Sequence, residues 1–250
     1  MSRGSLLGLS LICIALAWIA YERRKSEQGN RAVALLESHD AFVSWYVYPS
    51  PRRDFVKVLL GDDGFRKIES VIFKPGKVTD DDLDALGCLP RLSELTGCGA
   101  HVTDENISKL ACLTKLTILD LSHSRLSDQR LKAISSLREL QILSLGHSNV
   151  SDEGIKLLTT LPLSQLVLTQ CNVTDEGMKF IAEIHSLKHI DLTATDISDV
   201  GLAQLERLTS LKYVNITATP FITERGIQEL RDAKPGIEIH DRFGRPNAGE

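Results

Sequence analysis

The stretch that decides the fold is Leu116–Leu140, LTILDLSHSRLSDQRLKAISSLREL, because its parts recur along the chain at a near-constant interval. The clearest recurring part is a tripeptide of one β-branched or leucine residue, one Ser or Thr and one acid. Its acids follow one another at intervals of 24, 24, 24, 23, 24 and 25 residues: Asp80, Asp104, Asp128, Asp152, Asp175, Asp199 and Glu224. A period in this range is typical of a solenoid, in which each unit buries its apolar face only by stacking on its neighbours.

Within the quoted stretch, the pattern changes from a strand to a helix. Leu119 and Leu121 alternate with polar residues, which predicts a short strand with these two side chains inward. Ser127 and Asp128 then supply a helix N-cap and an acid in the first turn. Apolar residues at helical spacing follow and predict one buried helix face: Leu131, Ile134 and Leu137.

The same strand and helix pattern runs from about residue 70 to 240 and predicts eight strands and seven helices. The other strands are marked by Val71/Phe73, Leu143/Leu145, Leu166/Leu168, Ile190/Leu192, Val214/Ile216 and Ile237/Ile239, with a weaker one around Leu95. Successive strand–helix–strand units of one handedness give a parallel sheet with helices on one side. We therefore predict an α/β fold, a right-handed parallel solenoid whose sheet lines the concave surface.

This pattern resembles the leucine-rich repeat family. The family core L-x-x-L-x-L-x-x-N/C-x-L is visible as Leu140-x-x-Leu143-x-Leu145-x-x-Ser148-x-Val150. The motifs VTDEG and VSDEG, and the segment 59–65 before the first repeat, resemble the sequences of a bacterial subgroup that has one N-terminal membrane segment. The resemblance spans about residues 22–240 and implies a role in protein interaction or as a scaffold.

The resemblance also implies a role for one small residue in each turn. The family's Asn/Cys position is held here by Ser124, Ser148, Cys171, Thr195 and Thr219. We expect these side chains to hydrogen-bond the backbone of neighbouring turns as a ladder.

The N-terminal segment differs in kind from the array. Residues 6–21, LLGLSLICIALAWIAY, carry no charge and are followed by Glu22-Arg23-Arg24-Lys25. The apolar run is slightly short for a spanning helix, but its flanking aromatic and basic residues favour an uncleaved anchor over residues 1–25. Ala15-Leu16-Ala17 leaves a cleaved signal peptide open as the alternative. We expect a single-pass protein at the cell membrane, and the margin of basic residues is too small to fix its orientation.

Residues 26–69 are expected to connect this anchor to the array and to cap its first end. Ala32–Ser38 has the spacing of a short helix, and Ala41–Tyr48 has the composition of a strand. A second short helix is expected after Pro51, ending at Gly61. At the other end, residues 241–250 are polar and are expected to form a disordered tail.

Composition and motifs exclude several classes of function. The net charge is −4 with acids and bases mixed, which argues against a nucleic-acid partner. The five cysteines form no CxxC pair, and no Gly-rich phosphate loop, GxSxG or HExxH motif is present. We therefore expect no enzyme activity and no cofactor.

The concave sheet face is the expected binding surface. Residues that alternate with the inward leucines are expected to point into the groove in three rows, and the third row contains positions 98, 122, 146, 169, 193 and 217. Large amphipathic side chains supply most interface energy, which favours the region around the aromatic Tyr213. The candidate partner-binding residues are His189, Asp191, Tyr213, Asn215, Asp120 and Gln165.

Two further features bear on this face. His123 and His147 occupy the same place in adjacent repeats, so their side chains are expected about 5 Å apart. Asp120 lies nearby, but the row offers no third His or Cys, and we expect no metal site. Gly97 stands where other repeats have Leu or Ile, so the strand around Leu95 is expected to be weak.

Taken together, these patterns predict a membrane-tethered, non-enzymatic repeat protein that binds a protein or peptide on its concave sheet. The alternative is a sensor for a small molecule or an envelope glycan. A sensor needs an enclosed pocket and an output element, whereas an adaptor needs only a broad surface.

Overall fold

The structure is a computed structural model that describes residues 17, 20, 21, 24, 27–47, 66–74 and 78–241. Most of the expected anchor over residues 6–21, the expected helix after Pro51 and all but the first residue of the expected tail lie outside this range. Among the described residues, no helix combines the length and apolar character needed to cross a membrane.

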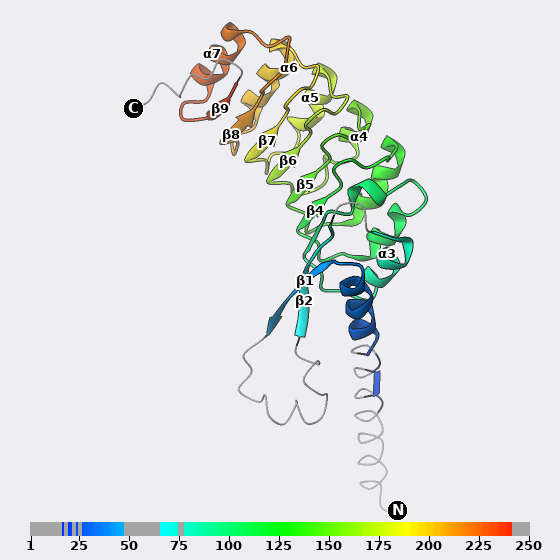
Figure 1. The fold of residues 1–250 in the computed structure, drawn as a ribbon. Helices are drawn as coiled ribbons and strands as arrows, with labels where there is room; N and C mark the ends of the chain where they lie inside the picture. The colour runs from blue at the N-terminus through cyan, green and yellow to red at the C-terminus, as the bar shows by residue number, and fades with distance from the viewer. Residues whose placement is uncertain are drawn as a thin grey trace, which may run out of the picture.

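One sheet runs the length of the molecule, with nine strands side by side in sequence order. The first pair, β1 and β2, is antiparallel, and β2 to β9 are parallel, as the repeat pattern predicts (Figure 1). The strands are β1 (Phe42–Val47), β2 (Arg66–Ile72), β3 (Glu94–Thr96), β4 (Ile118–Asp120), β5 (Ile142–Ser144), β6 (Gln165–Val167), β7 (His189–Asp191), β8 (Tyr213–Asn215) and β9 (Glu238–His240). The strand β2 begins at Arg66, four residues before the expected start of the array.

The helices form a single layer on one side of the parallel sheet (Figure 1). They are α3 (Asp80–Leu86), η3 (Ile107–Cys112), η4 (Asp128–Ser136), α4 (Asp152–Lys156), α5 (Asp175–Ile181), α6 (Asp199–Ala203) with its continuation η5 (Gln204–Arg207), and α7 (Glu224–Ala233). One additional 3₁₀ turn, η2 (Gly99–His101), follows β3. The core lies between the two layers, where Leu131, Leu145 and Leu166 are each 0% exposed.

An N-terminal cap covers the first end of the core. Residues 27–38 are helical, and Ala32 and Leu36 of this helix are buried against the first repeat. The cap is also joined to the array by a polar contact, because His39 Nδ1 lies 2.8 Å from Oδ1 of Asp82, whose side chain is fully buried. Burial raises the pKa of Asp82, but hydrogen bonds from Thr79 and His39 outweigh it, and the pKa lies below the ordinary value.

The recurring acid does more than begin its own helix. From Asp104 onward, each aspartate accepts two hydrogen bonds from the Ser or Thr that caps the helix of the next repeat. Asp175 Oδ1 accepts from the Ser198 amide at 2.8 Å, and its Oδ2 accepts from the Ser198 hydroxyl at 2.6 Å. The same pair of bonds joins Asp104 to Ser127, Asp128 to Ser151, Asp152 to Thr174 and Asp199 to Thr223. These aspartates therefore connect neighbouring repeats through pairs of hydrogen bonds.

A glycine two residues after the acid makes room for the aspartate of the preceding repeat. A Cβ atom at any of four such glycines would lie 2.1–2.3 Å from that carboxylate: Gly154, Gly177, Gly201 and Gly226. The helices that carry these glycines are all α-helical. In η3 and η4 the same position holds Asn106 and Arg130, and both helices are 3₁₀. In α3, by contrast, Asp82 holds this position and the helix is α-helical, so a side chain here does not by itself decide the type of helix.

The expected ladder of small polar residues is only partly correct. Ser148, Thr195 and Thr219 donate to carbonyls three residues earlier in their own repeats, at 2.5–2.7 Å. Cys171 alone among these positions reaches the preceding repeat, where its thiol lies 3.1 Å from the Leu145 carbonyl. The buried hydroxyl of Ser124 has no hydrogen-bond partner among the described residues.

The second repeat also departs from expectation. The strand β3 has three residues like its neighbours, although only two of them pair in register with β4. Gly97 has φ +79°, and a Cβ there would lie 2.1 Å from the Phe73 carbonyl oxygen. The backbone therefore turns earlier in this repeat. As a result, Cys98 is fully buried in the core, and its assignment to the concave row is wrong.

Candidate functional site

Five of the six predicted site residues lie on three adjacent strands. Register pairing places Gln165, His189 and Tyr213 in one row across β6, β7 and β8. The next row on the same strands contains Asp191 and Asn215, preceded by Val167. The sixth residue, Asp120, is on β4, three strands from Asp191 and so about 14 Å away. The structure therefore separates Asp120 from the other five.

A hollow of 340 Å³ opens at this place on the concave face. It is lined by Gln165, Val167, His189, Ile190, Asp191 and Tyr213. Four of these residues were predicted as site residues from the sequence, whereas Val167 was not among them and Ile190 is the inward core residue of β7. The hollow is shallow and open to solvent, so it offers a surface for contact and does not enclose a ligand.

The carboxylate of Asp191 is fixed by its neighbours. Its Oδ1 accepts from the Thr193 amide at 2.8 Å and from the Thr169 hydroxyl at 3.1 Å. Its Oδ2 accepts from the Asn215 side-chain amide at 3.0 Å. Asn215 Oδ1 in turn accepts from the Thr217 hydroxyl at 2.7 Å. This chain of bonds across β7 and β8 holds the charged group in one orientation. Asn215 itself is not among the residues that line the hollow.

Three rings meet at the C-terminal side of the hollow. The ring centroid of Tyr213 is 6.2 Å from that of His189 and 5.7 Å from that of His240 on β9. Burial, together with the charges of Asp191 and Glu238, raises the pKa of the Tyr213 hydroxyl. His240 was not among the candidate residues predicted from the sequence, of which Tyr213 and Asn215 on β8 are the last along the chain. Its alternation with Ile239 could have placed it on the same face.

The arrangement provides contact surface but no assembled acid–base relay among the described residues. The His189 ring is tilted by 43° relative to the Tyr213 ring, and the Asp191 carboxylate accepts hydrogen bonds from Thr169, Thr193 and Asn215. Acid–base catalysis needs the base in hydrogen-bond contact with both its orienting group and the reacting atom. The site can therefore bind through its ring cluster and carboxylates, and nothing in the described contacts activates a nucleophile.

The histidine pair is as close as predicted. The ring centroids of His123 and His147 are 4.5 Å apart with an interplanar angle of 7°. Parallel stacked rings direct their nitrogen lone pairs along parallel lines, so they do not converge on one ion. Within the described ranges, no group of three His, Cys, Asp or Glu side chains is close enough to hold a metal.

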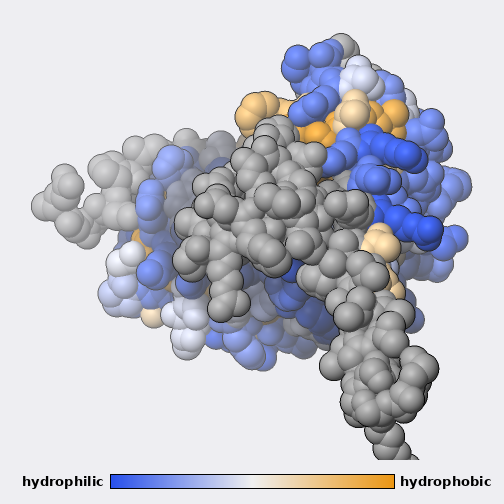
Figure 2. Space-filling view, turned by 90° about the horizontal axis from the view of Figure 1, so that it is seen from below, coloured by the Kyte–Doolittle hydropathy of each residue, from blue (hydrophilic) through white to orange (hydrophobic). Residues whose placement is uncertain are grey.

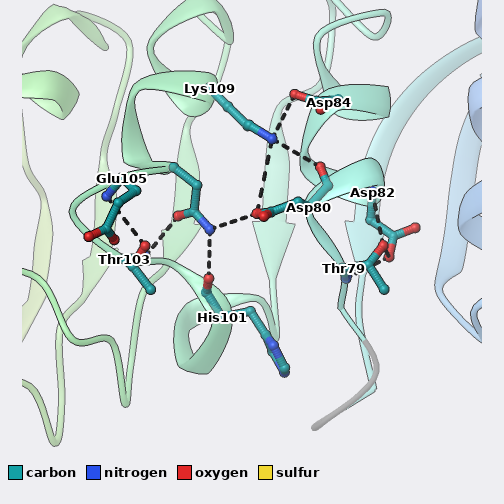
Figure 3. Close-up of polar contacts among 9 residues, drawn as sticks. Thr79, Asp80, Asp82, Asp84, His101, Thr103, Glu105 and Lys109 are labelled. Atoms are coloured by element: carbon teal, nitrogen blue, oxygen red, sulfur yellow. Dashed lines mark hydrogen bonds and ion pairs between the residues drawn. The ribbon is translucent and has the colours of Figure 1, made fainter.

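A second hollow, of 560 Å³, lies at the junction of the first two repeats and is lined in part by Asp80, His101 and Glu105. Here Asn106 takes the place of the glycine and enters the junction. Its Nδ2 donates to Asp80 Oδ1 at 3.1 Å, and its Oδ1 accepts from the Thr103 amide at 2.7 Å. Figure 3 shows Lys109 directed at Asp80 and Asp84, where Nζ lies 2.9 Å from Asp84 Oδ1. Asp80 thus interacts with both Asn106 and Lys109, which makes this junction a weaker candidate site.

The other described surface seen in Figure 2 is a weaker candidate for a binding site than the concave face. Seen from below, the described surface is mostly hydrophilic, with hydrophobic residues in small groups (Figure 2). Large exposed apolar side chains in the described residues from 42 onward occur in two small groups: Phe42 and Ile72 pair in register on β1 and β2, and Phe221 is bridged to Ser198, two residues before Val200. Small groups of exposed apolar residues are normal on a protein surface.

Comparison with known proteins agrees with this geometry. Four segments of the chain, residues 112–135, 137–158, 162–182 and 183–205, match the family described as Leucine Rich repeat. A solved structure with a similar fold is internalin C2 from Listeria monocytogenes, with 19% sequence identity and a TM-score of 0.52 over 72% of this chain and 81% of that chain. No curated protein matched the chain. Over these four segments the chain is therefore similar to the leucine-rich-repeat family, and its likeness to the internalin concerns the fold alone.

Proposed function

We propose that this protein is a non-enzymatic interaction module that binds a peptide or protein segment on the concave face of β6–β9, and that residues 6–21 tether it to a membrane. The observation that carries the binding proposal is the hollow lined by Gln165, His189, Asp191 and Tyr213. Leucine-rich-repeat folds are typically binding modules, and their domains generally bind proteins. The shallow, open form of the hollow favours a polypeptide over an enclosed small ligand.

The tether rests on the sequence of residues 6–25 alone. An uncharged run followed by three basic residues favours an anchored segment. Extraction of native membranes with alkaline carbonate tests it: the full-length chain should stay in the membrane pellet. Release of a protein about two kilodaltons smaller, as expected for removal of roughly 17–20 residues, would instead identify a cleaved signal peptide.

The binding proposal is tested by selecting a displayed random peptide library on the full-length protein. We expect selected peptides to lose binding to the Tyr213→Ala/His189→Ala double variant by about 2 kcal/mol or more, because aromatic anchors carry most interface energy. The matched control reverses the charge of two residues on the helical side, Lys156→Glu and Arg207→Glu. Loss of binding in this control, with normal binding by the double variant, would place the site on the helices.

A further inference from the structure

The charged residues of the concave face are all of one sign. The two rows that face the groove on β3–β9 contain 14 positions, and the acids among them are Glu94, Asp120, Asp191 and Glu238. None of these positions holds Lys or Arg. The whole chain has 29 basic and 33 acidic side chains, so the lack of bases on the face does not come from a general scarcity. The face therefore carries a negative field of its own.

The helical side has a different charge pattern. Lys156 lies 3.7 Å from Glu153, and Lys179 lies 2.6 Å from Glu176. Bases and acids there alternate and pair with one another, which is typical of an ordinary solvated surface. The single-sign field is thus a property of the groove.

Two of the four acids flank the ring cluster at the hollow. Asp191 lines the hollow and accepts three hydrogen bonds, which do not exhaust the acceptor capacity of its two oxygens. Glu238 is exposed and pairs in register with Tyr213. Both carboxylates act on the Tyr213 hydroxyl, since their charges raise its pKa in addition to the effect of burial. An aromatic ring between two carboxylates is the arrangement that favours a bound organic cation.

A second contact point lies further along the same row. Ile118 and Ile142 are half-buried neighbours on β4 and β5, and Ile142 is followed by Gln165, His189 and Tyr213. From β5 to β8 the distance across the sheet is about 14 Å. An extended peptide covers this distance in about four residues, because it advances about 3.3 Å per residue.

We propose that the partner segment is an extended basic peptide, with an Arg or Lys side chain seated at Tyr213 between Asp191 and Glu238 and an apolar side chain about four residues away on Ile118 and Ile142. This inference rests on the proposed function and names the chemistry of its partner. Arg fits better than Lys, because its planar guanidinium stacks on an aromatic ring while its N–H groups donate to carboxylates.

The test reads the composition of the peptides selected on the full-length protein. We expect an excess of Arg and Lys, with an apolar residue about four positions away. Peptides that depend on Tyr213 and His189 but show no basic excess would overturn this inference and leave the proposed function standing. Peptides that bind independently of both residues would contradict the proposed function itself.

A selected peptide then allows a direct test of charge. Replacement of its Arg by citrulline, which has nearly the same shape but no charge, should weaken binding about fivefold or more. Glu238→Gln should weaken the Arg peptide by a similar factor and leave the citrulline peptide unchanged. The matched control Glu183→Gln removes an exposed acid after α5 and should affect neither peptide. Equal loss for both peptides in Glu238→Gln would show that shape, not charge, matters there.

Discussion

The Oδ1 atom of Asp175 lies 2.3 Å from the point at which a Cβ atom on Gly201 would stand. The close approach of Asp175 in α5 to Gly201 in α6 explains why an acid and a glycine recur together in the sequence. The acid hydrogen-bonds the next N-cap, and the glycine of that next helix leaves space for it. The two residues belong to different repeats but form one structural unit.

The first prediction concerns the glycine. Gly201→Ala should lower the free energy of unfolding by about 1–3 kcal/mol, because the new methyl group overlaps the Asp175 carboxylate and must displace it. Chemical denaturation followed by circular dichroism measures the effect. The control is Gly29→Ala in the N-terminal helix, where a Cβ would meet no atom within 4 Å. An unchanged stability in Gly201→Ala would mean that the carboxylate can move aside freely.

The second prediction concerns the coupling of the two positions. Asp175→Ala should cost about 2–4 kcal/mol, because both charged hydrogen bonds to Ser198 are lost. In this background, Gly201→Ala should cost little, since the group it would overlap has been removed. A double-mutant cycle should give a coupling of about 1–2 kcal/mol. Additive effects would contradict the proposed pairing of acid and glycine.

The third prediction concerns the pH dependence of the cap. The pKa of Asp82 is lower in the folded protein than its ordinary value, so folding favours the carboxylate form. Its contribution to stability should be complete above pH 3.8, the ordinary pKa, and should be lost as the pH falls through the lowered folded value. Hydrogen exchange of the amides in residues 27–38 between pH 7 and pH 3 reports this loss.

Asp82→Asn is the matching variant for that experiment. It keeps the shape of the side chain but removes the charge, so amide protection in residues 27–38 should be reduced at pH 7 and should depend less on pH. If the variant and the parent protein lose protection in parallel as the pH falls, the pH dependence arises elsewhere.

The fourth prediction concerns the core. Leu145→Asp should destabilise the array by more than about 4 kcal/mol, because Leu145 is 0% exposed and the variant places an unpaired charge there. Ser144→Asp is the control, since the Ser144 side chain lies on the open face of the same strand. Thermal unfolding at equal temperature for Leu145→Asp and the parent protein would show that this position does not point inward.

The repeat pattern was sufficient to predict the sheet and helix layers. Apolar residues that alternate with polar ones, such as Leu143 and Leu145, predict strands. Both side chains are fully buried, which requires the sheet to pack one face against the helices. The predicted site residues were likewise brought together where they share neighbouring strands, as His189 and Tyr213 do. The membrane anchor stays a prediction, because residues 6–21 are mostly outside the described range.

Features that depend on contacts between repeats could not be predicted in the same way. The role of Gly201 becomes visible only when Asp175 of the preceding repeat is placed beside it. The position of Cys98 required the early turn at Gly97, which a pattern of hydrophobic spacing does not encode. His240 was overlooked because it lies on the last strand, after the repeat motif has ended.

The Asp–Gly pairing also bears on how such an array changes in length. The unit from Asp175 to Ser198 contains Gly177, which leaves space for Asp152 of the unit before it. It also contains Asp175, which accepts the hydrogen bonds from the N-cap of the next helix. A tandem copy of this unit would therefore meet matching surfaces on both sides. A unit with Arg130 at the glycine position adopts the 3₁₀ form, and a copy of it among α-helical units would introduce a change of helix type on the convex side. Gene duplication within this array is thus expected to favour the units from Asp152 onward over the first three.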